Sequence, residues 1–203
     1  MDKSKTENTE VEILNAAKEI FQQKGMDGTR MQEIADKAKI NKALLHYYYR
    51  SKQLLFEAVF KSAFGLLAPQ LNKVLNDNTD LFEKITNFTE SYISFVIKHP
   101  YLPNFVIQEL NRNPEFIQKL RAEKHFPTID TFRTQVAEAI QQGRIRPIEA
   151  EQLLINIISL NIFPFIGEPL LKALINADKA TYKKILHDRK TETANFIINA
   201  IKV

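Results

Sequence analysis

Residues 29–52 carry the sequence TRMQEIADKAKINKALLHYYYRSK, and this stretch decides the fold of the chain. Its apolar positions predict two short amphipathic helices separated by a turn at residues 38–40. Thr29 or Arg30 is the predicted cap of the first helix, and Asn41 caps the second. Two helices joined in this way form a helix-turn-helix, whose second helix enters the major groove of DNA. The side chains that we expect to be buried between the helices are Ile34, Ala35, Ile40 and Leu45.

Positive charge gathers on the second helix and its flanks. Between residues 37 and 52 the sequence holds five cations and no Asp or Glu. Cations at such a place neutralise DNA phosphates and make affinity dependent on salt. The three residues Tyr47–Tyr49 cannot all face inward on a helix, because successive residues lie about 100° apart. An aromatic core cluster over residues 44–49 is the alternative interpretation. The five cations are Lys37, Lys39, Lys42, Arg50 and Lys52.

The composition favours packed helices and excludes several classes of protein. Of 203 residues, 44% are hydrophobic, 26% are charged and only five are Gly, which suits an all-α fold. The absence of Cys excludes disulfides and thiolate metal sites, and the net charge of +4 permits a polyanionic partner. Residues 1–12 are polar, so we expect no secretory signal and a location in the cytoplasm. No apolar run has the length of a membrane span, so no membrane partner is expected.

The rest of the chain shows helical periodicity without repeats. Thr9 is the predicted cap of a helix over about 9–24, after a loose tail, and Gly25 ends it. Ser51 caps a long helix from Lys52, with a further helical segment after Pro69. The expected domains are a helix-turn-helix head over 1–52 and a body over 53–203. The remaining helices are predicted over 80–99, 104–111, 113–123, 128–142, 147–163 and 178–201, with a break at Pro164, Gly167 and Pro169.

These residues resemble the DNA-binding signature of the TetR family of regulators. The resemblance rests on Ile34-Ala35, the stretch 38–42, Leu45, Tyr48-Tyr49 and Ser51-Lys52. Upstream, Ala16-Ala17, Ile20-Phe21, Gly25 and Thr29 also fit, so that the resemblance covers about residues 10–60. It implies that two groups of side chains contact DNA, one at the start of the first short helix and one on the second. The implied contacts are Thr29, Arg30, Gln32, Asn41, Lys42, Ala43, Leu44, His46, Tyr47, Tyr48 and Lys52.

Three positions depart from the family pattern. Lys39 stands where the family usually has Gly, so a left-handed backbone there would cost about 1 kcal/mol or more. Leu44 and His46 replace the usual Thr and Tyr at positions that face the groove or the phosphates. The base sequence of the operator therefore cannot be carried over from the family.

The body offers a candidate effector pocket and a candidate dimer face. Large aromatic residues with a few polar neighbours are typical of a small-molecule site, although core filling is the favoured explanation for each single aromatic. The pocket prediction comprises Phe88, Tyr92, Phe95, Phe105, Gln108, Phe116 and Phe132. Two helices that are apolar on more than one side predict an intermolecular four-helix bundle in a homodimer. The dimer prediction comprises Leu154, Ile158, Ile162, Phe196, Ile197 and Ala200.

The sequence thus predicts a DNA-binding transcriptional regulator, in particular a ligand-responsive repressor that binds a palindromic operator as a dimer. An activator of the same fold and a helical protein-binding adaptor are the alternatives. The four His residues are scattered and no Gly-rich phosphate loop is present, so we expect no catalytic residue, no metal and no cofactor.

Overall fold

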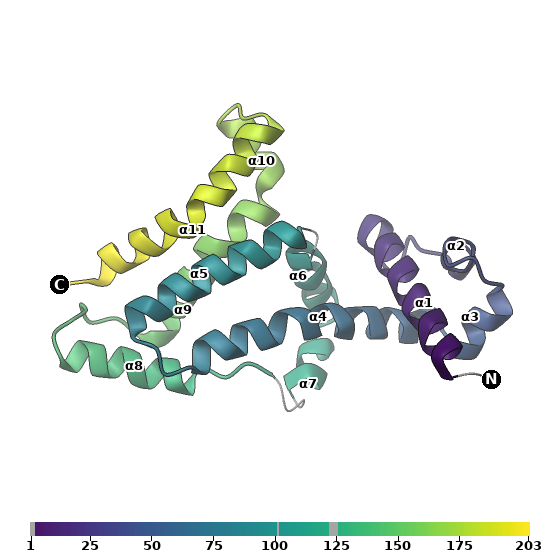
Figure 1. Ribbon diagram of the computed structural model, residues 1–203, viewed down its shortest axis with the longest axis horizontal. Helices are drawn as coiled ribbons and strands as arrows, with labels where there is room; N and C mark the ends of the chain where they lie inside the picture. Colours follow the sequence, from purple (N-terminus) through teal and green to yellow (C-terminus); the bar gives the residue numbers. More distant parts are fainter. Residues whose placement is uncertain (1–2, 101, 122–125) are drawn as a thin grey trace. The chain divides into compact units, whose positions relative to one another are not determined.

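The structure is a computed structural model that describes residues 3–100, 102–121 and 126–203 (Figure 1). In these ranges it contains α-helices and no strand, apart from one isolated antiparallel bridge between Ile145 and Lys202. The predicted all-α class is confirmed. The chain forms two compact units, residues 1–65 and 66–203.

The first unit is a small helical head with its own core. Its helices are α1 (Lys3–Lys24), α2 (Met31–Lys37), α3 (Lys42–Tyr48) and the first half of α4 (Lys52–Asn76). The rings of Phe21 in α1 and Phe56 in α4 meet edge to face, with centroids 4.9 Å apart. Because the first half of α4 supplies core residues to this unit, the unit extends past the boundary at residue 52 that the sequence suggested.

Both ends of α1 have a local cause. Gly25 has φ +66°, a left-handed conformation that Gly adopts at no steric cost, so the predicted end is confirmed. The prediction of a loose tail and a cap at Thr9 is wrong, because α1 already begins at Lys3. The segment before Thr9 contains Lys and Glu, which favour helix, and neither Gly nor Pro.

Helix α4 continues through Pro69, where the sequence suggested a break. Proline cannot donate a backbone hydrogen bond, so the carbonyl of Gly65 loses its partner within the helix. Gly65 is exposed and a Cβ built on it would touch nothing within 4 Å, so water can reach this part of the backbone. Ser51 begins α4 as predicted, since the backbone N–H of Leu54 donates to Ser51 Oγ at 3.1 Å.

Within the described residues, the second unit contains the second half of α4 and helices α5 to α11. Helices α5 and α11 lie side by side along much of their length (Figure 1). Asp178, the first residue of the helix predicted over 178–201, caps α11, because its carboxylate accepts from Thr181 N at 2.7 Å. Asp80 caps α5 in the same way and accepts from Phe82 N at 3.0 Å. The helices are α5 (Leu81–Lys98), α6 (Leu102–Arg112), α7 (Glu115–Arg121), α8 (Asp130–Gln141), α9 (Ala150–Ile166), α10 (Glu168–Leu174) and α11 (Lys179–Ile201).

Helix α9 also differs from its prediction, because it begins at Ala150 and contains Pro164. Pro164 cannot donate to the carbonyl of Leu160, four residues earlier, and α11 supplies the missing donor. The guanidinium of Arg189 donates to Leu160 O at 2.6 Å. One turn further, the hydroxyl of Tyr182 donates to Pro164 O at 2.7 Å, near the end of α9. Side chains of α11 thus satisfy the carbonyls that the Pro and the helix end leave open.

No single helix of the described residues is long and apolar enough to span a membrane. Helices α9 and α10 together have sufficient length and hydropathy, but they are bent by 78° at their junction.

A buried lysine joins the end of α4 to α5. Lys84 is 1% exposed, and its ammonium lies 2.8 Å from a carboxylate oxygen of Asp77. It also donates to Leu75 O at 3.2 Å and Asp77 O at 2.8 Å. Burial raises the pKa of Asp77, but hydrogen bonds from Lys84 and Thr79 outweigh this effect, so the pKa lies below its usual value. Lys84 therefore holds the carbonyls of the α4 terminus in place.

We predict that Lys84→Met lowers the free energy of unfolding by about 3 kcal/mol, because it leaves an anion and two carbonyls without their donor. Urea denaturation at pH 7 measures the loss, and Lys98→Met on the exposed end of the same helix is the control. Since the folded-state pKa of Asp77 is depressed, its contribution is present above the unfolded pKa and declines as the pH falls through the folded pKa. The difference between wild type and Lys84→Met should therefore shrink in acid. Equal stability of Lys84→Met and Lys98→Met would contradict the assignment.

Candidate nucleic-acid interface

Helix α3 is held in place by its buried face and its cap. Leu45 is buried, as are Ile34 and Ala35 on α2, whereas Ile40 is only half-buried. The predicted cap is confirmed, because the backbone N–H of Leu44 donates to Asn41 Oδ1 at 2.7 Å. One face of α3 therefore packs in the head, and the opposite face is left to the solvent.

The turn between α2 and α3 has a left-handed residue at Lys39, with φ +55°. Its N–H donates to Asp36 O at 3.1 Å, and the N–H of Ile40 donates to Ala35 O at 3.0 Å. This pair of bonds is the Schellman motif, which ends a helix and normally places Gly at the left-handed position. Helix α8 ends in the same way at Gly143 (φ +65°), so Lys39 keeps a strained conformation where the chain elsewhere uses Gly.

Polar contacts tie both ends of the helix-turn-helix to the rest of the head. The hydroxyl of Tyr49 donates to Glu10 Oε1 on α1 at 3.1 Å, and burial, together with the Glu10 charge, raises the pKa of Tyr49. The ammonium of Lys52 donates to Thr29 O at 3.0 Å, which joins the start of α4 to the turn that precedes α2. Lys24 on α1 pairs with Glu33 on α2 at 2.8 Å.

The outward face of α3 consists of Lys42, Ala43, His46 and Tyr47, which are all exposed. Tyr47 is 73% exposed and meets Tyr48 edge to face, with centroids 5.6 Å apart. Leu44, Tyr48 and Tyr49 are half-buried, and Asn41 is exposed while it caps α3. The residues 44–49 are therefore no closed aromatic core. They belong to the end of α3, and the exposed face of this helix carries the cation Lys42, the small Ala43 and the ring of Tyr47 together.

The predicted contacts around α2 divide into exposed and buried residues. Arg30 and Gln32 are exposed, and Gln32 Nε2 donates to Asp36 Oδ1 at 2.7 Å. Thr29 is 2% exposed and its hydroxyl donates to Gly25 O at 2.7 Å. The prediction that Thr29 touches DNA is corrected, because its side chain is buried and its hydroxyl is hydrogen-bonded within the turn after α1. Lys52 is half-buried, and its ammonium donates hydrogen bonds to backbone carbonyls of the head. Its contact with DNA stays a prediction.

Two further exposed cations lie close in sequence to the predicted DNA contacts, although they were not among them. Lys39 in the turn and Arg50 after α3 are exposed, beside the predicted contacts in the chain. Lys37 differs from these two cations, because its ammonium forms an ion pair with Glu19 at 2.6 Å. The signal that could have identified the first two is the acid-free run between residues 37 and 52.

The aromatic residues predicted to line an effector pocket lie mainly in the core of the second unit. Phe88, Tyr92 and Phe132 are buried in one cluster, and Phe88 stacks on Tyr92 with centroids 5.6 Å apart. Phe105 is buried, Phe95 half-buried and Gln108 exposed, while the side chain of Phe116 lies outside the described residues. Core filling accounts for the buried members, and a pocket lined by this set stays a prediction.

The predicted dimer residues also divide. Phe196 on α11 is 63% exposed, and Ile158 and Ala200 are exposed as well. Ile197 is buried in the core of its own chain, so its assignment to the dimer face is corrected. Leu154 and Ile162 are half-buried. Ile155 and Phe163 of α9 were not among the predicted dimer residues, but both are exposed. A helix that is apolar on several sides does not reveal from its sequence which side faces outward.

Comparison with known proteins gives one match to a family model. Residues 13–59 match the model for the bacterial regulatory proteins of the tetR family. They span the second half of α1, all of α2 and α3, and the start of α4. The chain is 27% identical over 143 residues to the HTH-type transcriptional regulator RutR of Escherichia coli strain K12, covering 70% of this chain. It is 26% identical over 142 residues to the HTH-type transcriptional repressor NicS of Pseudomonas putida, again covering 70%. The matched regions span 66% of RutR and 62% of NicS, less than two thirds of either protein.

The fold also matches solved structures. The structure of AibR in complex with isovaleryl coenzyme A and operator DNA superposes with a TM-score of 0.64 at 19% identity, covering 90% of this chain and 96% of AibR. At this identity the likeness concerns the fold, and it extends over both compact units of the chain.

We predict that Lys39→Gly stabilises the helix-turn-helix by about 1 kcal/mol, because Gly adopts a left-handed backbone without the clash of a Cβ. Hydrogen–deuterium exchange of the amides in residues 31–48 measures the effect, and about fivefold slower exchange is expected. Lys39→Ala, which loses the charge but keeps the Cβ, should exchange no more slowly than wild type. The strain assignment fails if the Gly and Ala variants behave alike.

Proposed function

The chain belongs to the TetR family of bacterial regulatory proteins, and on that premise we propose that it is a dimeric, ligand-responsive repressor that binds a palindromic operator. The observation that carries the proposal is the position of α3. Its Leu45 side is closed into the head, while Lys42, Ala43, His46 and Tyr47 face outward. An outward helix of this kind has the dimensions and the chemistry to enter a major groove.

Each exposed side chain of α3 has a role in this proposal. Lys42, in the first turn, is the candidate for a base contact, most naturally to the acceptor edge of guanine. Tyr47 supplies a ring for a thymine methyl or a sugar, and a hydroxyl for a phosphate. Arg30 and Gln32 at the start of α2 are exposed and would contact the backbone or a base edge. The acid-free run from residue 37 to 52 supports the phosphate contacts by its charge.

The repressor assignment is supported by relatives that include the repressor NicS. The response to a ligand is supported by the fold likeness to AibR, which was solved with isovaleryl coenzyme A and operator DNA. A ligand that binds one conformation of this chain more tightly would shift its population away from the DNA-binding state. In this proposal the chain itself carries out no catalysis.

The dimer is proposed on the exposed apolar side chains of α9 and α11. About half or more of each of three apolar side chains is exposed, namely Ile155, Phe163 and Phe196. In a monomer this apolar surface would stay in contact with water. A two-fold dimer would present two copies of α3 to successive turns of one DNA face, so a palindromic site matches it.

We predict that Lys42→Ala and Tyr47→Ala weaken binding to a palindrome selected from random DNA by roughly 5- to 100-fold, as lost groove contacts do. Gel-shift titration at several salt concentrations measures the affinity and the number of phosphates neutralised. Lys183→Ala on the exposed side of α11 is the control and should bind like wild type. The assigned face is rejected if both α3 variants keep wild-type affinity, and DNA binding itself is rejected if no duplex binds in a salt-dependent way.

We predict that the wild-type chain sediments at twice its mass of 23.5 kDa at micromolar concentration. Phe196→Asp should sediment as a monomer, because it places a charge in an apolar contact. Tyr47→Ala, on α3, should remain a dimer. A monomeric wild type would overturn the dimer.

A further inference from the structure

A hollow of about 290 Å³ lies between α9 and α11 on the second unit. Its walls carry two apolar side chains, a cation, an anion and a hydroxyl, which are Leu160, Phe196, Arg189, Glu192 and Thr193. None of the residues predicted to line an effector pocket lines this hollow, so it is distinct from the predicted pocket.

Arg189 reaches the hollow because α9 needs a donor. Its guanidinium caps Leu160 O at 2.6 Å, the carbonyl that Pro164 leaves open. The Nε atom of Arg189 is buried and has no hydrogen-bond partner among the described residues. Burial lowers the pKa of Arg189, as expected for a desolvated cation, and no carboxylate of the described residues is among the groups that shift it. Such a group calls for an acceptor from outside its own fold.

Thr193 gives the same indication independently. It lies one turn after Arg189 on α11, is 3% exposed, and its hydroxyl has no partner within the described ranges. Buried hydroxyls are normally hydrogen-bonded, so an unpartnered hydroxyl on the wall of a hollow points to a polar group that enters it. Arg189 and Thr193 together offer two donors to one acceptor.

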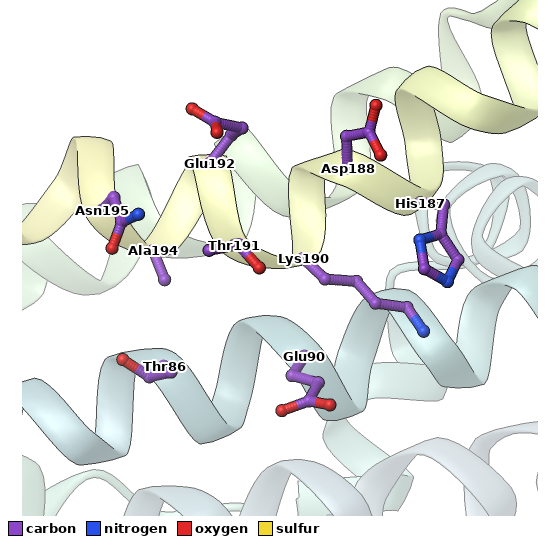
Figure 2. Close-up of a pocket in the computed structure, with 9 residues that line it drawn as sticks. All are labelled: Thr86, Glu90, His187, Asp188, Lys190, Thr191, Glu192, Ala194 and Asn195. Atoms are coloured by element: carbon purple, nitrogen blue, oxygen red, sulfur yellow. The ribbon is translucent and has the colours of Figure 1, made fainter.

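Glu192 supplies the complementary charge. It is exposed, it lines the same hollow, and its carboxylate makes no ion pair in the described structure, although Arg189 lies three residues away. Figure 2 shows a second, larger hollow between α5 and α11, in which Lys190 and Thr191 point toward α5 while Glu192 points to the opposite side. The carboxylate of Glu192 therefore extends outward from α11, away from α5.

We propose that a second copy of this chain closes the smaller hollow, with its Glu192 carboxylate accepting hydrogen bonds from Arg189 and Thr193. A two-fold interface is reciprocal, so the first copy returns the same contact and forms two equivalent ion pairs. A free small acid fits less well, because Glu192 on the wall would repel it, whereas a second copy brings both charges in equal number. Phe196 and Leu160 line the same hollow, so in the dimer they would pack over the pairs and exclude water. The inference rests on the proposed dimer and names the polar contact that specifies it.

The first test reverses one charge. In a homodimer of Glu192→Arg, Arg189 of each copy would face a second cation in place of the carboxylate. We therefore expect the dimer dissociation constant to rise at least tenfold. Glu138→Arg makes the same charge change on an exposed position of α8 and should leave the constant unchanged. Sedimentation velocity over a dilution series measures all three proteins. Wild-type dimerisation by Glu192→Arg would overturn the ion pair while leaving the dimer intact, whereas a monomeric wild type would overturn the dimer itself.

The second test restores the charges in a mixed dimer. Arg189→Glu and Glu192→Arg are each repelled in their homodimers, but a heterodimer of the two has opposite charges in both pairs. We expect affinity-tagged Arg189→Glu to capture Glu192→Arg and not to capture itself. Absence of the heterodimer would overturn the proposal if circular dichroism shows that both variants are folded.

A second pair of variants covers the case in which Arg189→Glu does not fold. Arg189→Gln and Glu192→Gln should each weaken the dimer, and the double variant should be no weaker than the weaker single one, because both remove the same contact. Penalties that simply add would overturn the pairing. Titration of wild type with acetate and benzoate completes the test, since binding of either acid at Arg189 without dimerisation would assign the hollow to a free carboxylate instead.

Discussion

The orientation of the proposed DNA-reading face depends on one residue of left-handed backbone. Lys39 ends α2 with two hydrogen bonds of a Schellman motif and directs the chain toward the cap of α3 at Asn41. If this turn opened, Leu45 would lose its buried place and the exposed face of α3 would have no fixed direction. A cation in a strained turn keeps positive charge next to the recognition helix at the expense of local stability.

Local chemistry made the helix ends predictable. Asn41 and Asp178 cap helices as their side chains suggested, and Gly25 and Gly143 end them. The misjudged positions are mainly the prolines at 69 and 164, where the sequence indicated a break and the helices continue. A proline removes one donor, but a neighbouring helix or water can replace it, and that replacement is a tertiary effect that local sequence does not contain.

The candidate site was predictable to the level of a helix face, with less accuracy for single residues. The spacing of Ile34, Ala35 and Leu45 indicated which side of α2 and α3 is buried, so the outward position of Lys42 and Tyr47 followed. Thr29 was misplaced because a Thr before a helix suits a phosphate contact and a turn equally well, and only the distance to Gly25 O distinguishes them. In the body, α9 and α11 are apolar nearly all round, so periodicity could not separate the core side, where Ile197 lies, from the outer side of Phe196.

The bond from Arg189 to Leu160 makes two distant positions historically dependent on each other. Replacement of Pro164 first would restore a helical N–H for Leu160, and Arg189 would then be needed only for the ion pair proposed with the second copy. A lineage that replaced Arg189 first would leave a bare carbonyl in the middle of α9. Substitution of Pro164 can therefore precede substitution of Arg189, whereas the reverse order leaves a carbonyl without a donor. As long as Pro164 is present, α9 needs the donor that Arg189 of α11 supplies.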